Sequence, residues 1–268
     1  MDALEKQLYA SPRNLRYLMT VAILLIVLFV WSLSAINLNN FEQSGWEVAT
    51  SIITGILQPE TDLLFNFTSK GVMYLLVETM AIAFLGTIAG ACLAVPLAFL
   101  SASNVVPGPV AWLTRILLIF IRTVPALVYG LMFIRVAGQG PFAGVLTIAV
   151  ISIGMLSKLF VDAIEDLDTS ILESMTSIGC STFEKIRYGI LPQLFSMFSS
   201  IIIYRFDMNL REASILGLVG AGGIGAPLIF AMNSYRWTEV GAILIGLVVL
   251  ILLVEFFSNR IRTKLVRG

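Results

Sequence analysis

Long apolar runs with almost no charge restrict the fold of this chain more than any other feature. The run from Tyr17 to Ile36, YLMTVAILLIVLFVWSLSAI, contains no charged residue. About 20 apolar helical residues cross the roughly 30 Å hydrocarbon core of a bilayer. The chain is 58% hydrophobic and 13% charged, whereas a soluble domain is about 45–50% apolar and about 25% charged. The sequence therefore predicts an all-α integral membrane protein.

The apolar runs predict six transmembrane helices, at residues 18–36, 72–100, 112–136, 142–163, 194–217 and 238–257. The first is longer than the roughly 7–15 apolar residues of a cleaved signal peptide, which favours a retained anchor, although the SLSA at its end resembles a cleavage site. No internal repeat is evident, so an inverted-repeat transporter is not indicated. Residues 1–70 are expected to hold an N-terminal cytoplasmic segment, the first helix and an outer loop, and 71–268 the main membrane domain.

Lysine and arginine are distributed unevenly between the connections, which predicts the orientation in the membrane. Cytoplasmic loops of membrane proteins carry an excess of Lys and Arg. With a cytoplasmic N-terminus, only Lys70 and Arg236 fall outside, and eleven fall inside: Lys6, Arg13, Arg16, Arg115, Lys158, Lys185, Arg187, Arg260, Arg262, Lys264 and Arg267. Both termini are therefore expected in the cytoplasm, and so is the polar loop 166–192 between the fourth and fifth helices.

The residue types that are missing exclude most kinds of catalytic chemistry. The chain has no histidine, and its two cysteines, Cys92 and Cys180, lie far apart. Ser-His-Asp catalysis, Cys-His catalysis and the usual transition-metal sites depend on these residues. Lys plus Arg and Asp plus Glu number 17 each, so no net charge draws the chain to nucleic acid. We expect no catalytic residue, metal site, cofactor or nucleic-acid partner.

The polar loop contains LESMTSIGCSTFEKIRYGILPQ, residues 172–193, which predicts two short helices separated by a glycine. A residue of the Asp-Thr-Ser run 168–170 can cap the first helix by accepting N–H groups of its first turn. Gly179 can end it in a left-handed conformation, and Pro192 is expected to stop the second. Three apolar residues recur on one side of the first helix: Ile171, Met175 and Ile178. Such a ridge fits a partner's groove, but helical spacing alone equally favours a helix on the bilayer or beneath the bundle.

The spacing within this loop resembles the cytoplasmic signature of ABC importer permeases. That signature is Glu-Ala-Ala, three residues, Gly, nine residues and Ile-x-Leu-Pro, and four residues stand in register with it: Glu173, Gly179, Leu191 and Pro192. Ser174 and Met175 replace the two alanines, and Gly189 replaces the isoleucine. The resemblance implies a coupling helix that docks on an ATP-binding subunit, with these site residues: Glu173, Ser174, Met175, Ile178, Gly179, Phe183 and Pro192.

Three further segments are similar to the permeases of bacterial phosphonate importers: IRTVPALVYGLMFI at 121–134, GMLSKLFVDAIEDLD at 154–168 and NLREASILGLVGAGGIGAPL at 209–228. The resemblance runs from about Leu75 to the C-terminus. It implies a plasma-membrane subunit that imports phosphonates or related phosphorus oxyanions, with ATP hydrolysed by two copies of a separate ATP-binding subunit. It also implies an extracytoplasmic binding protein and a second permease chain, identical or related.

Three alternatives stay open on the sequence. A methionine-importer permease has a similar glycine-rich segment after the equivalent helix, although the Arg-Thr-Val-Pro stretch favours phosphonate. A stand-alone secondary transporter would use intramembrane acids such as Glu78 and Asp207 and would need no ATPase. A membrane enzyme would need an intramembrane carboxylate or lysine as its base.

The glycine-rich stretch GAGGIG, residues 220–225, fits the G-x-G-x-x-G pattern of dinucleotide-binding folds letter for letter. That motif needs a preceding strand and an acidic residue about 20 positions later, whereas a predicted membrane helix precedes it here and the next acid is Glu239. Irregular backbone is tolerated in a membrane where it faces protein or a water-filled path. We therefore expect a tight turn at the outer end of the fifth helix, built on Gly220, Gly222, Gly223 and Gly225.

Several charged residues fall within the predicted spans. Each costs about 2.5–3.5 kcal/mol near the bilayer centre unless it is paired or faces a cavity. Asp207 and Arg211 are four apart on one helix and can pair. Glu78 is expected within reach of Arg205 or Asp207. These charges either hold the bundle together or line an anion pathway, for which the candidates are Arg122, Arg205, Arg211 and Glu78. Arg122 is foremost, because its own helix holds no nearby acid.

Overall fold

The computed structural model describes residues 15–35, 43–66, 68 and 71–267, and all regular elements in those ranges are helices. The chain divides into two compact units, residues 1–50 and 51–268, which are described separately. Four helices are long and apolar enough to cross a membrane, or five spans if one bent pair counts as a span. The prediction of an all-helical membrane protein is confirmed.

The first unit contains α2 (Leu15–Ala35) and the first half of α3 (Gln43–Leu57). α2 corresponds in position to the predicted first span 18–36, whose last residue lies outside the described ranges, but it is not among the four helices long enough to cross a membrane. Every side chain from Tyr17 to Leu33 is exposed within this unit. A helix that is apolar on all sides needs lipid or protein around it.

The second unit is built on four long helices: α5 (Val72–Ser101), α8 (Pro141–Glu165), α11 (Leu191–Gly217) and α13 (Trp237–Arg267). α5 and α8 match the predicted spans 72–100 and 142–163 within two residues at each end. α13 continues ten residues beyond the predicted end at 257. The prediction followed the apolar run, whereas the last turns of the helix are basic and still helical.

The third predicted span, 112–136, is not the single helix that the sequence predicts. The structure has α6 (Gly108–Thr123) and α7 (Ala126–Ala137), whose axes differ by 85°. Val124 is extended, at φ −84° and ψ 124°, because a residue that precedes proline is pushed out of the helical region. Pro96 lies inside α5, which nevertheless continues past it. Proline alone therefore does not decide where a membrane helix breaks.

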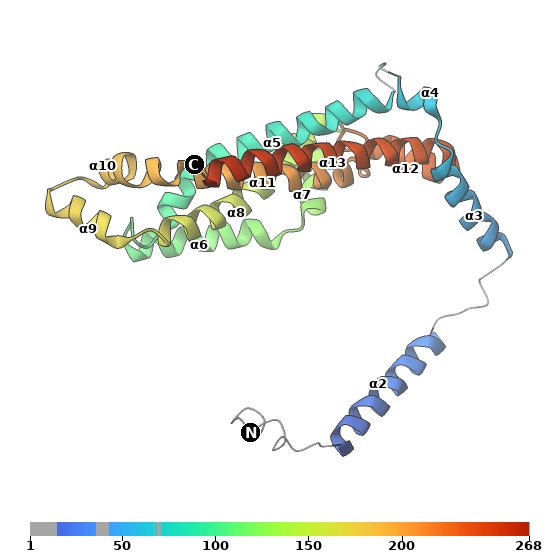
Figure 1. The fold of residues 1–268 in the computed structure, drawn as a ribbon, viewed down its shortest axis with the longest axis horizontal. Helices are drawn as coiled ribbons and strands as arrows, with labels where there is room; N and C mark the ends of the chain where they lie inside the picture. Colours follow the sequence, from blue (N-terminus) through green and yellow to red (C-terminus); the bar gives the residue numbers. More distant parts are fainter. Residues whose placement is uncertain (1–14, 36–42, 67, 69–70, 268) are drawn as a thin grey trace. The chain divides into compact units, whose positions relative to one another are not determined.

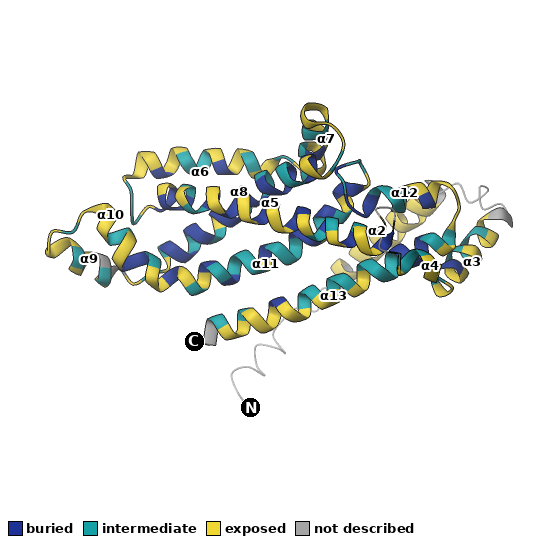
Figure 2. Ribbon diagram, turned by 90° about the horizontal axis from the view of Figure 1, so that it is seen from above, coloured by how far each residue is buried: buried dark blue, intermediate teal, exposed yellow. Residues whose placement is uncertain are grey.

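Buried residues concentrate where α5, α8 and α11 meet (Figure 2). Glycines bring α5 and α8 into backbone contact, since a Cβ on Gly90 would lie only 2.6 Å from the Cβ of Ser152. Asn209 of α11 is fully buried between these helices. Its amide donates to the hydroxyls of Thr87 and Ser152 at 2.7 and 2.8 Å. This link joins three spans through polar side chains.

The short helices occupy opposite ends of the second unit (Figure 1). α9 (Thr169–Ser177) and α10 (Thr182–Glu184) lie at one end, together with η2, a π-helix over Lys185–Ile190. α4 (Thr61–Leu64), α12 (Gly225–Asn233) and the start of α13 lie at the other.

Candidate functional site

The first helix of the polar loop forms as the sequence predicts. Asp168 caps α9, because its carboxylate accepts the backbone N–H of Ser170 at 2.9 Å. That bond holds the pKa of Asp168 below its ordinary value. Gly179, at φ +84°, ends the helix. The N–H of Cys180 returns to the carbonyl of Met175 at 3.0 Å, which satisfies one of the free carbonyls of the last turn.

A second cap, which the sequence analysis missed, fixes the start of α10. The N–H of Ser181 donates to the carboxylate of Glu184 at 2.7 Å, and the N–H of Glu184 returns to the Ser181 hydroxyl at 3.4 Å. The signal was present in the sequence as Ser-x-x-Glu, the pattern of a capping box. A side-chain cap therefore fixes the residue at which each of the two helices begins.

The expectation that Pro192 stops the second helix is wrong. α10, η2 and α11 form one continuous helical segment from Thr182 to Gly217. Pro192 has no N–H to donate to the carbonyl of Tyr188, and the helix widens to π spacing over Lys185–Ile190 before it narrows again. The side chain of Gln193 donates to the carbonyl of Gly189 at 2.7 Å. The proline thus loosens this helix without ending it, and the polar loop continues directly into α11.

The side chains of the predicted ridge do not share one environment. Met175 is half-buried against η2, where its sulfur packs on Gly189. Ile178 and Phe183 are 79% and 67% exposed. The carboxylate of Glu173 is also exposed and makes no hydrogen bond or ion pair with the described residues. Met175 therefore packs on the helix below it, whereas the other face of the loop leaves apolar and acidic side chains exposed.

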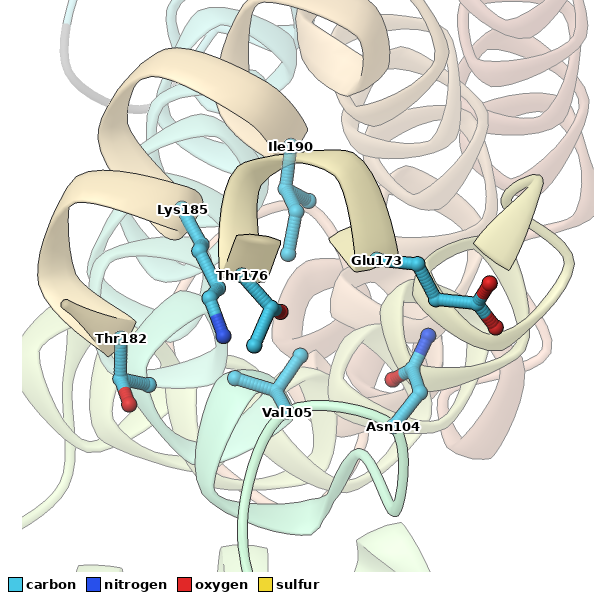
Figure 3. A pocket seen from close by; sticks show the side chains of 7 residues that line it. All are labelled: Asn104, Val105, Glu173, Thr176, Thr182, Lys185 and Ile190. Carbon is cyan, nitrogen blue, oxygen red and sulfur yellow. The ribbon is translucent and has the colours of Figure 1, made fainter. Parts of the chain in front are cut away.

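A recess of about 260 Å³ lies behind α9 (Figure 3). Its wall comes from α9, α10, η2 and the loop between α5 and α6, through Asn104, Val105, Glu173, Thr176, Thr182, Lys185 and Ile190. The ammonium of Lys185 points into it, and Glu173 lies on the other side (Figure 3). Asn104 donates to the carbonyl of Ile164 at 2.8 Å, while its own side-chain oxygen is buried without a partner. The recess joins the polar loop to the ends of α5 and α8.

Most intramembrane charges are paired, though not all in the predicted way. Arg211 contacts Asp207 at 3.0 Å, which confirms the predicted pair, and also Glu255 of α13 at 3.2 Å. Arg205 is 5% exposed and contacts Glu212 at 3.1 Å. Glu78 was expected to reach Arg205 or Asp207, and this is wrong: it accepts the N–H of Gly223 at 2.9 Å. The carboxylate of Glu78 therefore binds the backbone of the glycine-rich turn and not an arginine of α11.

Arg122 differs from the other candidates because it has no ionic or hydrogen-bond partner among the described residues. It lines a recess of about 260 Å³ between α6 and α8 with Arg115, Leu118, Ile119, Lys158, Val161 and Glu165. Arg115 pairs with Glu165 at 2.5 Å, and Lys158 pairs with Asp162. The stem of Arg122 lies across Gly154, where a Cβ would come within 2.6 Å of its Cγ. The unpaired charge of the recess is thus that of Arg122.

The glycine-rich stretch is a turn between α11 and α12, as predicted. Gly220, Gly222 and Gly223 adopt positive φ, and Gly225 begins α12. α5 holds the turn, since Ile224 donates to the hydroxyl of Thr79 at 2.9 Å beside the bond from Gly223 to Glu78. A helix precedes the turn where a dinucleotide fold needs a strand. The stretch is therefore a turn between two helices and does not stand in the context of a dinucleotide loop.

Comparison with known proteins adds four findings. Residues 94–268 match the family described as binding-protein-dependent transport system inner membrane component. The phosphite transport system permease protein PtxC of Stutzerimonas stutzeri is 34% identical over 188 residues, 70% of this chain and 68% of that protein. The phosphate-import permease protein PhnE of Mycolicibacterium smegmatis is 35% identical over 204 residues, 75% of this chain but 38% of that protein. A chain of the inward-facing MetNI methionine ABC transporter shares the fold, with a TM-score of 0.63 at 21% identity, over 72% of this chain and 97% of that one.

Proposed function

This chain belongs to the family of binding-protein-dependent transport system inner membrane components, and we propose that it carries phosphonates or related phosphorus oxyanions across the bacterial plasma membrane. Membership makes it the permease of an ATP-driven importer, and the chemistry of ATP belongs to another subunit. The relatives that transport phosphite and phosphate support an oxyanion as the substrate. The methionine transporter supports the fold alone, at 21% identity.

In the proposed topology the chain crosses the membrane six times, with both termini in the cytoplasm. α2 is the first span, the bent pair α6–α7 is the third and α8 is the fourth. The α9–η2 segment then lies between the fourth and fifth spans as the coupling element, and residues 71–268 form the permease domain. Two ATP-binding subunits dock from the cytoplasm, a binding protein delivers substrate outside, and a second permease chain completes the pathway.

The observation that carries this proposal is the exposed face of the α9–η2 segment. Glu173 has no partner among the described residues, and Ile178 and Phe183 are mostly exposed. Glu173 and Gly179 stand in register with the family signature, and Gly179 shapes the end of α9. A folded, capped helix that presents unpaired acidic and apolar groups is suited to a groove on a partner.

Co-purification from detergent with the ATP-binding subunit of the importer tests the coupling element. We expect Glu173→Lys and Gly179→Leu to release the ATP-binding subunit. Two matched controls should retain it: Asp62→Lys reverses an exposed charge at the other end of the unit, and Gly179→Asn tolerates a positive φ. If the chain purifies alone and moves substrate in liposomes without ATP, it is a stand-alone transporter and the proposal fails.

For the pathway we propose Arg122 as the residue that eases passage of the anion, because its charge is unpaired and faces a recess. Arg122→Gln should lower phosphonate uptake at least tenfold, while the complex still assembles and hydrolyses ATP at its basal rate. Arg205 and Arg211 have acidic partners, so neutralising them should reduce assembly as well. Unchanged uptake by the Arg122→Gln variant would remove this residue from the pathway.

A further inference from the structure

The end of α12 contains a residue in an unfavourable conformation. Tyr235 has φ +56°, and all other described residues with positive φ are glycines. The N–H of Tyr235 donates to the carbonyl of Met232 at 3.1 Å, and that of Arg236 donates to Ala231 at 3.0 Å. This pair of bonds defines a helix end whose left-handed position is normally glycine. A tyrosine there strains the backbone, and such strain is retained mainly at functional sites.

The strained turn places Tyr235 and Arg236 at the surface, with Trp237 half-buried beside them. Tyr235 is 69% exposed, and the edge of its ring meets Trp237, with centroids 6.0 Å apart and planes at 85°. Arg236 lies over the ring of Phe230 at 5.1 Å and contacts Glu239 at 2.5 Å. Tyr, Arg and Trp are the residue types that dominate binding energy in protein interfaces. Their fixed geometry lowers the entropy that a partner would lose by ordering them.

A polar recess of about 340 Å³ adjoins this turn, lined by Ser51, Thr54, Gly55, Gln58, Tyr235, Arg236, Trp237, Thr238 and Glu239. The second half of α3 forms its other wall. Glycines bring α3 against α13, because a Cβ on Gly55 would lie 2.4 Å from the Cβ of Trp237. The carbonyl of Thr238 accepts the N–H of Glu60 at 3.2 Å. The recess is thus held from both sides before any partner arrives.

We propose that the outer docking surface, formed by Tyr235–Glu239 with Ser51, Thr54 and Gln58, receives the soluble binding protein. It lies at the end of the unit opposite α9 and α10 (Figure 1), so this inference rests on the proposed orientation, with α9 in the cytoplasm. A bilayer interface also attracts Trp and Tyr. It does not account for the polar recess beside the turn, whereas a folded protein partner could fill that recess with polar side chains of its own.

The test is the stimulation of ATP hydrolysis by the binding protein in the assembled complex in nanodiscs. Tyr235→Gly removes the ring and suits the left-handed backbone, so the turn stays intact. We expect the binding-protein concentration for half-maximal stimulation to rise at least tenfold, and Arg236→Ala to act in the same direction. Phe65→Ala is the matched control, since Phe65 is 68% exposed outside this surface. The rate without binding protein is the internal reference.

Four outcomes of this experiment can be distinguished. Equal stimulation of the wild type and Tyr235→Gly overturns the docking surface and leaves the proposed function standing. A wild-type complex that hydrolyses ATP but does not respond to its binding protein overturns both. Tyr235→Gly could also lower the rates of ATP hydrolysis with and without binding protein by the same factor. That result assigns Tyr235 a structural role and overturns the docking surface. A loss of response confined to the surface variants, with Phe65→Ala unaffected, supports it.

Discussion

The sulfur of Met175 in α9 lies 2.6 Å from the position that a Cβ on Gly189 in η2 would occupy. The family signature has alanine at the first position and isoleucine at the second. The two departures therefore lie against each other: a larger side chain on α9 fills the space left by a smaller residue on η2. Gly189 is buried and Met175 half-buried, so this contact joins α9 to the helix that continues into α11.

This contact predicts compensation between the two positions. Gly189→Ile should displace Met175, and Met175→Ala should leave a gap, so each change should weaken attachment of the ATP-binding subunit. The double variant has a small side chain at 175 and a large one at 189, so it should regain attachment of the ATP-binding subunit. We expect a coupling energy between the two positions of about 1 kcal/mol or more. A double-mutant cycle on thermal unfolding, read beside co-purification, measures this. Additive single effects would mean that the two side chains do not share this space.

The bond from Gly223 to Glu78 predicts different results for two substitutions. Glu78→Ala leaves a backbone N–H without its acceptor, at a cost of about 1–3 kcal/mol. Glu78→Gln keeps an oxygen in place and should cost less than half as much. Thermal unfolding of the purified complex gives both values. If Glu78→Gln keeps its stability but loses uptake, the charge of Glu78 serves the pathway and not only the turn.

The left-handed backbone at residue 235 predicts the order of stability of two variants that both lack the ring. Tyr235→Gly should be more stable than Tyr235→Ala by about 1–2 kcal/mol, because a Cβ is unfavourable at φ +56°. Comparing these two removes the contribution of the contact with Trp237. Thermal unfolding in detergent measures the difference. Equal stabilities would show that residue 235 relaxes to another conformation.

Close packing of α5 on α8 predicts that a single methyl group disturbs the bundle. In Gly90→Ala the new Cβ would stand 2.6 Å from the Cβ of Ser152 and 2.8 Å from the carbonyl oxygen of Ala149, so the helices must separate. We expect the free energy of unfolding of this variant to fall by about 1–3 kcal/mol. Gly108→Ala is the matched control, because nothing lies within 4 Å of its added Cβ. Similar unfolding midpoints for both variants would contradict the contact.

Features that depend on neighbouring residues could be predicted from the sequence. The apolar runs placed α5 and α8 within two residues, because a helix that crosses lipid must satisfy its own backbone and cover it with apolar side chains. Gly179 and the glycines of 220–223 were predicted as helix ends and turns, since they take positive φ without a Cβ clash. The Ser181–Glu184 capping box was equally local and could have been found.

Proline shows where local reasoning fails. Pro125 separates two helices at 85°, Pro96 leaves α5 intact, and Pro192 only widens a helix to π spacing. The same ring removes one donor in each case. The outcome depends on whether the packing around the helix makes a straight or a broken path more favourable, and that packing comes from other segments.

By itself, the sequence determined where the long apolar helices α5 and α8 lie, which loop is polar and where glycine ends a helix. Only the tertiary structure decided which groups meet. Glu78 accepts a hydrogen bond from Gly223, which lies 145 positions later in the chain. Asn104, from the loop between α5 and α6, lines the same recess as Glu173 of α9. Helix formation and turns are fixed by bonds within a few residues. Contacts between spans depend on the helix rotation and depth at which small residues allow backbones to touch, and no single segment encodes them.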